Sequence, residues 1–269
     1  MKIGFYKYHG TGNDFIIIDN RKRKFIGNKK TIARLCHRRF GIGADGLMLL
    51  ENQKGYDFKM IYFNSDGNES SFCGNGSRCM VAFAKMLGIL KKTETKFIAT
   101  DGIHTAKIIA SLKSTPKEDT LVSMNMRDIK NIEISDDYYL LNTGSPHYVK
   151  FTNAVKDIEI VAEAKKVRYN ERFKKDGVNV NFAEKNGKGI FVRTYERGVE
   201  DETLSCGTGV TASALAAAVQ GFSNADNFCN ISTLGGELTV RFEKGKENSF
   251  TNVWLEGSAT FVYKGTVTI

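Results

Sequence analysis

The chain contains little proline, little tryptophan and no long apolar run. Its 269 residues include two prolines and one tryptophan. Without a stretch of about 18 uncharged apolar residues, the sequence predicts no membrane-spanning helix and no membrane partner. The first residues, MKIGFYKYHGTGNDF, lack the apolar segment of a secretion signal, which favours a cytoplasmic location. The length favours two compact halves of about 130 residues each.

Cysteine pairs of the C-x-x-C type are also missing. The five cysteines are Cys36, Cys73, Cys79, Cys206 and Cys229. An odd number without a secretion signal argues against a disulfide framework, and the missing pairs argue against a zinc ribbon or a thioredoxin-type site. We therefore expect no metal centre. Each cysteine is either a buried apolar residue or a reactive thiol, and its sequence context must decide.

The net charge of +9 does not form a single basic stripe. The lysines and arginines occur as dispersed clusters, and aromatic residues do not alternate with them. This pattern favours a solvated surface over nucleic-acid binding. Binding to a polyanion is the less favoured alternative.

Short strand-like runs dominate the chain, which predicts an α+β protein with mostly antiparallel strands. Helical spacing is confined to Lys29–Arg39, to Val155–Lys166 and to segments that begin near Gly76 and Cys206. The turn-forming stretch Lys113–Asp119 is the best boundary. It divides the chain into residues 1–117 and 118–269, with the last strand, about 260–269, able to pack back onto the first half.

An internal repeat links the two halves. The segments Tyr62–Gly88 and Thr194–Gly221 each contain an aromatic-ending strand, an acidic loop, the motif Cys-Gly-x-Gly and an apolar helix that ends at a glycine. A helix that is apolar on all faces is a buried helix. The repeat therefore predicts two pseudo-symmetric halves, each a β-barrel-like sheet wrapped around one central apolar helix.

The repeated motif places Cys73 and Cys206 at the starts of the two buried helices. The positive end of a helix dipole lowers the pKa of a thiol, and the following N–H groups can bind a carboxylate or an oxyanion. If the halves face each other, two thiols approach one substrate from opposite sides. One thiolate can then remove an α-proton while the other thiol returns a proton to the opposite face. The alternative is that both cysteines are buried, inert helix-cap residues. For Cys36, Cys79 and Cys229, which lack this motif, we expect a packing role only.

Six segments together resemble the diaminopimelate epimerase family. They are KYHGTGNDF near the start, GIGADG at Gly41–Gly46, NSDGNESSFCGNGSR at Asn64–Arg78, TGSPH at Thr143–His147, GVNVNF at Gly177–Phe182 and YERGVEDETLSCGTG at Tyr195–Gly209. The resemblance implies a cofactor-independent isomerase that interconverts LL- and meso-diaminopimelate in lysine and peptidoglycan precursor synthesis. It also implies a homodimer and the fold of two similar halves.

The resemblance further implies roles for individual residues. Cys73 and Cys206 correspond to the catalytic acid and base, and His147 and Glu196 to residues that tune the thiols or orient the reacting centre. The substrate-binding residues it implies are Asn13, Asn64, Gly74, Asn75, Asn179, Glu196, Arg197, Gly207 and Thr208. Four residues in these two sets have simpler interpretations from the sequence alone: a turn for Asn13, an Asx turn for Asn64, a buried core histidine for His147 and a surface charge for Arg197.

Three positions depart from the family pattern. Asn68 stands where serine is usual, Ser145 where many members have asparagine, and Gly46 where some use glutamine. The last two put in doubt how the distal end of the substrate is held. Two other activities compete with the epimerase: a related cysteine-pair racemase that acts on proline or hydroxyproline, and a redox protein that uses the two thiols as a dithiol/disulfide pair.

Overall fold

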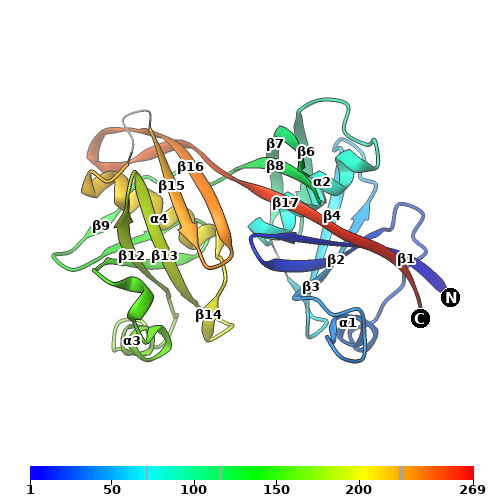
Figure 1. The fold of residues 1–269 in the computed structure, drawn as a ribbon, viewed down its shortest axis with the longest axis horizontal. Coiled ribbons are helices and arrows are strands. Elements are labelled where there is room, and N and C mark those ends of the chain that lie inside the picture. Colours follow the sequence, from blue (N-terminus) through cyan, green and yellow to red (C-terminus); the bar gives the residue numbers. More distant parts are fainter. Residues whose placement is uncertain (71, 115–116, 224–226) are drawn as a thin grey trace. The chain divides into compact units, whose positions relative to one another are not determined.

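Two compact units make up the chain (Figure 1). The computed structural model describes residues 1–70, 72–114, 117–223 and 227–269. Unit 1 contains Met1–Met124 together with Gly257–Ile269, and unit 2 contains Asn125–Glu256. Within the described part, no helix is long and apolar enough to cross a membrane.

The division between the units follows Met124. The stretch Lys113–Asp119, where the sequence analysis places the boundary, includes residues 115–116, which lie outside the described residues. The rest of that stretch belongs to two antiparallel strands of unit 1, β7 (Gly102–Ser114) and β8 (Lys117–Asn125). The last residues, Gly257–Ile269, belong to unit 1 and pair with its first strand, β1 (Lys2–Gly10).

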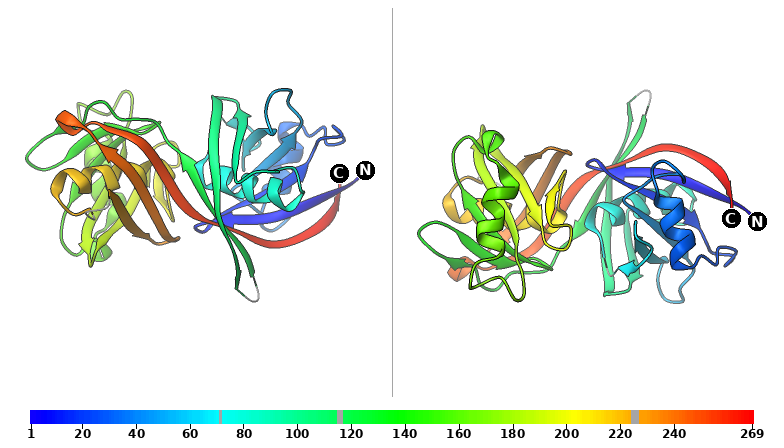
Figure 2. Two further views of the ribbon diagram at one scale, coloured as in Figure 1. Left: turned by 90° about the horizontal axis from the view of Figure 1, so that it is seen from above. Right: turned by 90° about the horizontal axis from the view of Figure 1, so that it is seen from below.

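The remaining elements of unit 1 follow in chain order. They are β2 (Asn13–Asp19), α1 (Lys29–Cys36), β3 (Gly46–Glu51), β4 (Phe58–Asn64), β5 (Glu69–Ser70), α2 (Gly74–Met86) and β6 (Glu94–Ala99). The final strand, β17 (Phe250–Thr268), starts in unit 2 and ends in unit 1. Its end lies beside the N-terminus in Figures 1 and 2, where the Met1 amino group donates to the Ile269 carbonyl at 2.7 Å.

Unit 2 has the same kinds of elements. They are β9 (Glu133–Ile134), β10 (Tyr139–Asn142), β11 (Pro146–Phe151), η1 (Val155–Asp157), α3 (Ile160–Arg168), β12 (Asn179–Asn186), β13 (Gly189–Glu196), β14 (Asp201–Thr203), α4 (Gly207–Gln220), β15 (Phe228–Thr233), β16 (Gly236–Lys244) and η2 (Lys246–Asn248).

The two units repeat one order of strand pairing. In unit 1, β2 and β3 are parallel, β3 and β4 antiparallel, β4 and β6 parallel, and β6 and β7 antiparallel. In unit 2, the same relations hold for β11 and β12, β12 and β13, β13 and β15, and β15 and β16. The predicted α+β fold of two pseudo-symmetric halves is therefore confirmed, with some parallel pairs among the antiparallel ones.

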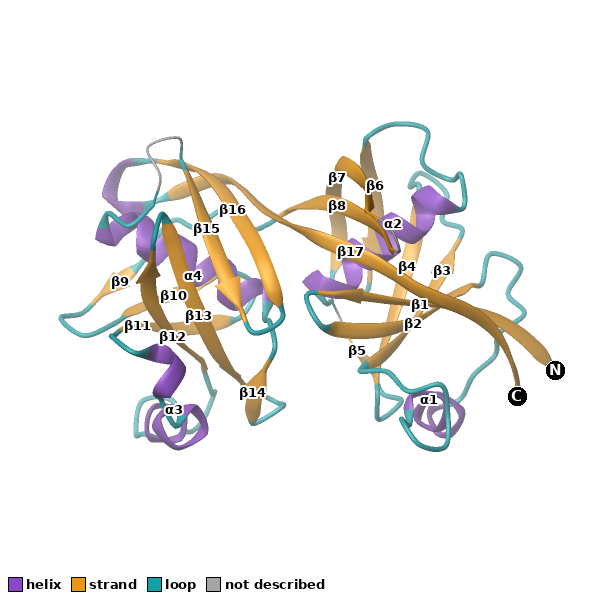
Figure 3. Cartoon of the chain, viewed as in Figure 1, coloured by secondary structure: helices purple, strands orange, loops and turns teal. Residues whose placement is uncertain are grey.

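A buried helix lies at the centre of each unit, surrounded by that unit's strands (Figure 3). Ten residues of α2 and eleven of α4 are buried. A Cβ at Gly76 in α2 would lie 1.8 Å from the terminal methyl group of Met48, which would have to move, and a Cβ at Gly209 in α4 would lie 2.5 Å from Asn181 Oδ1. The repeat at Cys-Gly-x-Gly thus brings each helix start close to the surrounding strands.

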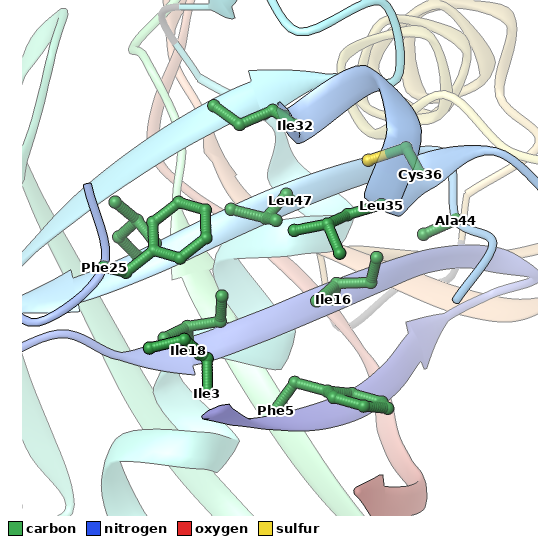
Figure 4. Packing of buried hydrophobic residues seen from close by; sticks show 11 residues of the cluster. Ile3, Phe5, Ile16, Ile18, Phe25, Ile32, Leu35, Cys36, Ala44 and Leu47 are labelled. Atoms are coloured by element: carbon green, nitrogen blue, oxygen red, sulfur yellow. The ribbon is translucent and has the colours of Figure 1, made fainter. Parts of the chain in front are cut away.

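A second apolar layer covers the outer face of β1–β3. Ile32, Leu35 and Cys36 of α1 point toward Ile16 and Leu47 in this layer (Figure 4). The expected helix Lys29–Arg39 ends earlier, at Cys36, because His37 adopts an extended conformation. Gly41 does not cap this helix; a Cβ there would lie 2.0 Å from the Arg34 carbonyl oxygen.

Two other expected elements differ from the structure. The helical spacing predicted over Val155–Lys166 splits into η1 and α3. The split follows from Ile158, whose extended backbone ends the first turn, so that the longer helix begins at Ile160. The predicted last strand, about 260–269, is the end of the longer, 19-residue strand β17.

Candidate active site

Cys73 immediately precedes α2, with extended backbone angles (φ −140°, ψ 116°) and no capping bond from its side chain. Its thiol instead donates to Asn13 Oδ1, with 3.6 Å between sulfur and oxygen. The N–H groups of the first helical turn have no partner within the helix, as at every helix start. The thiol and a set of anion-binding donors therefore occupy the same end of α2.

The orientation of the Asn13 amide is determined by Asp45. Asn13 Nδ2 donates to Asp45 Oδ2 at 2.6 Å, so Oδ1 faces Cys73 and the amide of Asn75, whose Nδ2 lies 3.5 Å from it. Asp45 also accepts from Arg38 at 2.7 Å. Asn13 is therefore more than the turn residue that its sequence context allows, because its side chain joins Cys73 to Asn75.

The neighbouring carboxylate of Asp14 is compensated by two cations. Lys7 Nζ lies 2.7 Å from Asp14 Oδ2, and Arg38 donates to both carboxylate oxygens at 3.0 and 2.8 Å. Burial opposes ionisation, but the hydrogen bonds from Arg38 and Lys7 outweigh it and hold the pKa of Asp14 well below its usual range. Lys7, Arg38, Asp14 and Asp45 thus form a balanced charge cluster on the far side of Asn13.

A fully buried arginine supports the same end of α2. Arg78 Nη2 donates to Asn75 Oδ1 at 2.9 Å and to Thr11 Oγ1 at 3.2 Å. Its Nε and Nη1 find no hydrogen-bond partner within the described part of the chain. Sequence reasoning missed Arg78 and Thr11, although a charge within the buried part of an otherwise apolar helix was a usable signal for Arg78.

Cys206 precedes α4 as Cys73 precedes α2, with φ −113°, ψ 113° and no side-chain cap. Its sulfur lies 3.5 Å from Thr208 Oγ1. The Thr208 hydroxyl lies 2.9 Å from His147 Nε2, and the Thr208 carbonyl accepts from Thr143 Oγ1 at 2.8 Å. The predicted residues His147, Thr208 and Cys206 therefore form one chain of contacts in unit 2.

The direction of the hydrogen bonds in this chain follows from Asn181. Its Oδ1 accepts from Thr194 Oγ1 at 2.9 Å, and its Nδ2 donates to the Tyr148 carbonyl at 3.0 Å and to His147 Nδ1 at 3.1 Å. His147 Nδ1 is thus an acceptor, and its proton is on Nε2, which donates to Thr208. The hydroxyl proton of Thr208 is left to point at the Cys206 sulfur.

The imidazole of His147 remains neutral. Complete burial lowers its pKa to about 3, helped by the positive charge of Arg197 and opposed by the hydrogen bond with Asn181. The interpretation as a satisfied core histidine is therefore correct for its burial. Its hydrogen bond with Thr208 nevertheless connects it to Cys206 through a single side chain. Sequence reasoning missed Asn181. The alternation of residues along the predicted strand did not distinguish it from a polar strand residue without a functional role.

Asn179 is buried and both protons of its side-chain amide are hydrogen-bonded. Its Nδ2 donates to Ser145 Oγ at 2.8 Å and to the Pro146 carbonyl at 3.0 Å, and its Oδ1 accepts from the Arg197 N–H at 2.9 Å. The exposed Arg197 donates from Nη1 to the Asp176 carbonyl at 2.8 Å. Asn179 thus links Ser145, a departure from the family pattern, to Arg197.

Asn64 and Glu196 end the equivalent strands β4 and β13. Asn64 is exposed, and its backbone, rather than its side chain, makes the turn bonds with Gly67 and Asn68. Burial raises the pKa of Glu196. Among the described residues, the side chain of Asn64 makes no hydrogen bond to Cys73 of its own unit, and that of Glu196 makes none to Cys206 of its own unit.

Gly46 lies opposite Asn64 in the ladder of β3 and β4. A Cβ at Gly46 would lie 2.5 Å from Tyr62 Cε2 and 2.7 Å from the Phe63 carbonyl. The Tyr62 ring therefore occupies the space into which a side chain at position 46 would project. A glutamine at this position would require Tyr62 to move.

The other three cysteines are buried, as expected of packing residues. Burial raises the pKa of Cys36 to about 11 and that of Cys229 to about 12, and it raises the pKa of Cys79 further still. These thiols therefore stay protonated at neutral pH. Across the described ranges, no group of three histidine, cysteine, aspartate or glutamate side chains is placed to hold a metal ion.

Comparison with known proteins identifies the family. A sequence model described as "Diaminopimelate epimerase" matches residues 5–120 and 139–262. The diaminopimelate epimerase of Flavobacterium psychrophilum is 50% identical over 265 residues, covering 97% of this chain and 99% of the relative. This chain belongs to the diaminopimelate epimerase family. The family's member from Chlorobaculum tepidum is 36% identical, covering 97% of this chain and 99% of the relative.

Solved structures share the fold at low identity. A phenazine biosynthesis protein of the PhzF family from Bacillus anthracis superimposes with a TM-score of 0.75 at 15% identity, covering 100% of both chains. A probable proline racemase from Agrobacterium radiobacter gives a TM-score of 0.68 at 14% identity, covering 99% of this chain and 93% of the other. These likenesses confirm the predicted fold class, and the family assignment favours an epimerase over the racemase and redox alternatives.

Proposed function

We propose that this chain interconverts LL- and meso-diaminopimelate by a two-base mechanism in which Cys73 and Cys206 carry the protons. Family membership supports the reaction. The observation that carries the mechanism is the matched position of the two thiols, each at the N-terminus of a buried helix and each in contact with a polar side chain, Asn13 for Cys73 and Thr208 for Cys206. This arrangement is repeated in two units that share one order of strand pairing.

The proposed reaction is balanced in protons and electrons. The thiolate of one cysteine takes the α-proton, and the electron pair of the broken C–H bond passes to the α-carbon and its carboxylate. The thiol of the other cysteine then gives its proton to the opposite face of that carbon. The product is the epimer, and the two cysteines have exchanged protonation states. The mechanism requires both sulfurs to reach one α-carbon.

The N–H groups that follow each cysteine are proposed to stabilise the charge that develops. Gly74 and Asn75 in unit 1, and Gly207 and Thr208 in unit 2, begin the helices whose first N–H groups lack partners within the helix. Such donors are best placed for a carboxylate that gains charge in the transition state. Asn13 accepts the hydrogen bond of the Cys73 thiol. His147 holds the Thr208 hydroxyl beside Cys206.

The distal end of the substrate is proposed to contact Arg197, Asn64 and Glu196. Arg197 is exposed and can form a bidentate pair with a carboxylate. Asn64 and Glu196 offer an amide and a carboxylate at equivalent strand ends, which suit the carboxylate and ammonium groups of an amino acid. Asn179 acts indirectly in this proposal, because its bonds to Ser145 and Pro146 use both of its amide protons and its Oδ1 accepts from the Arg197 N–H.

Isotope exchange tests the reaction. Incubation with LL-diaminopimelate in deuterated water is expected to give meso product with deuterium at the α-carbon. Cys73→Ser and Cys206→Ser are each expected to lower turnover at least about 100-fold under reducing conditions, whereas Cys36→Ala retains it. If neither meso product nor α-deuterium forms, the proposed reaction is refuted. If the serine variants keep full turnover, the two-cysteine mechanism is refuted.

We also propose a cytoplasmic homodimer that needs neither a cofactor nor a nucleic-acid partner. The proposal draws on the family resemblance and on the dispersed positive charge. Light scattering of the purified chain is expected to give twice the 30.0 kDa mass of one copy. A monomer mass at the concentrations used for activity would contradict the dimer.

A further inference from the structure

Arg78 is a buried cation without a carboxylate partner. Its side chain is fully buried, and none of the salt bridges among the described residues includes it. Burial lowers the pKa of Arg78, although a guanidinium remains charged at neutral pH. An isolated buried charge is costly, so proteins normally pair it. Since the fold keeps this charge, its counter-charge is expected to arise during function.

Among the described residues, one neighbour of Arg78 can supply that negative charge. Two thiols interact electrostatically with the guanidinium, Cys79 and Cys73. Cys79 is fully buried and its pKa is raised far above the usual range, so it stays protonated. Cys73 is partly accessible and is linked to Arg78 by the side chains of Asn75 and Asn13.

The repeat strengthens this assignment. Asn75 and Thr208 are each the second residue after a cysteine, and each receives a hydrogen bond from a buried basic side chain, Arg78 or His147. Arg78 occupies the fifth position after Cys73. The fifth residue after Cys206 is Thr211, whose hydroxyl donates to the Gly207 carbonyl of its own helix at 2.9 Å. The fixed charge is therefore specific to unit 1.

We propose that Arg78 is a positioning residue that stabilises the negative charge of the Cys73 thiolate, acting as a fixed cation held against Asn75. The inference rests on the proposed function only in taking Cys73 as a reacting thiol. Cys206 receives a different kind of support, from the neutral pair of His147 and Thr208. The two thiols of the proposed mechanism would then be activated by different means.

Other charges around α2 do not replace Arg78. The strands packed against the helix are β1, β2, β3, β4 and β7. Among their titratable side chains, Tyr6 and Tyr8 lie against Phe83 of the helix, Tyr62 lies against Phe15 of β2, and His104 lies against Phe72, which precedes Cys73. His104 is paired with Asp101 at 3.0 Å, and the cluster of Lys7, Arg38, Asp14 and Asp45 is balanced.

The pH dependence of alkylation tests the proposal without substrate. Intact protein is treated briefly with iodoacetamide between pH 5 and 10, and the modified peptides that contain Cys73 and Cys206 are quantified by mass spectrometry. Because the thiolate is the nucleophile, the midpoint of each curve reports its formation. Arg78→Met is expected to raise the Cys73 midpoint by about 1 pH unit or more. Alkylation of Cys73 at pH 7 would then be about tenfold slower.

Three controls separate charge from structure. The Cys206 midpoint is an internal control and should stay constant. Arg78→Gln keeps a donor for Asn75 but removes the charge, so it should shift Cys73 as Arg78→Met does. Thr11→Ala removes the other acceptor of Arg78 but keeps the charge, so the Cys73 midpoint should remain within about 0.3 pH units of the wild-type value.

Two results would overturn the proposal. One is an unchanged Cys73 midpoint in a folded Arg78 variant. The other needs no variant: a wild-type Cys73 midpoint at or above about 8.5, the value of a free cysteine. Because both measurements are made without diaminopimelate, they stand apart from the isotope exchange experiment, and failure of one does not imply failure of the other.

Discussion

Replacing Thr208 by valine removes a single hydroxyl from the chain that joins His147 to Cys206. Valine has nearly the same shape as threonine, so the packing of α4 is retained. The hydroxyl accepts from His147 Nε2 at 2.9 Å and lies 3.5 Å from the Cys206 sulfur. Thr208→Val therefore deprives the Cys206 thiolate of a donor and leaves the buried His147 N–H without its acceptor.

The magnitude follows from the charge of the thiolate. A hydrogen bond to a charged group contributes about 1.5–3 kcal/mol, which corresponds to about a 10- to 150-fold loss in kcat/KM. The unsatisfied His147 N–H adds a cost to folding of about 1–3 kcal/mol. In a chain of this length each kcal/mol lowers Tm by about 2–4 °C.

The assay compares Thr208→Val with Thr208→Ser. Serine keeps the hydroxyl and loses only a methyl group, so it should retain kcat/KM within about threefold. Rates are measured from both LL- and meso-diaminopimelate, since both directions use both cysteines. If valine and serine give the same kcat/KM, the hydroxyl does not act on Cys206 and the direction derived for the hydrogen bonds is wrong.

Two further predictions concern the same network. Burial holds the pKa of His147 at about 3, so the unfolded chain binds a proton near pH 6.5 that the folded chain does not. The contribution of neutral His147 to the free energy of unfolding is full above pH 6.5 and is lost as the pH falls toward 3, by up to about 1.4 kcal/mol per pH unit. Between pH 7 and pH 5, urea unfolding should show a smaller decrease in this free energy for His147→Gln than for the wild type. Equal decreases would contradict the prediction. Gly209→Ala forces its Cβ to within 2.5 Å of Asn181 Oδ1, so it should destabilise the protein by about 1–3 kcal/mol and lower activity. Gly4→Ala, whose Cβ would meet nothing closer than 4.0 Å, should leave both unchanged.

The repeat around the two cysteines predicted more of the fold than any single periodicity. Matched Cys-Gly-x-Gly motifs and apolar helices indicated two similar halves, which the pairing of β2–β7 and β11–β16 confirms. Element ends were less predictable. Whether α1 stops at Cys36 depends on the conformation of His37, and spacing of apolar residues does not contain that information.

The candidate site was predicted residue by residue but not as a network. Asn13, His147 and Thr208 were expected to contact substrate or tune thiols, and the structure joins each to a cysteine directly or through one side chain. Arg78 and Asn181 were not predicted. Their importance depends on which side of a buried helix or strand carries them, and on partners far along the chain.

The same limit applies to Gly46. From the sequence, this glycine is only the loss of a glutamine found in some relatives. In the structure, the Tyr62 ring covers the position at which a side chain would begin. Gly46 and Tyr62 lie on adjacent strands, β3 and β4. The Tyr62 ring fills the space beside Gly46 through packing between these strands, which a single sequence does not reveal.

The long strand β17 has a consequence for how the chain is made. Residues 257–269 complete unit 1 by pairing with β8 and β1, yet they are synthesised after all of unit 2. During translation, the residues around Cys206 can fold as soon as unit 2 has left the ribosome, whereas β1, which pairs with β2 on one edge, must wait for β17 on the other. The half that contains Cys73 begins first and closes last, so a chain interrupted after unit 2 carries one finished half and an open sheet edge beside the other.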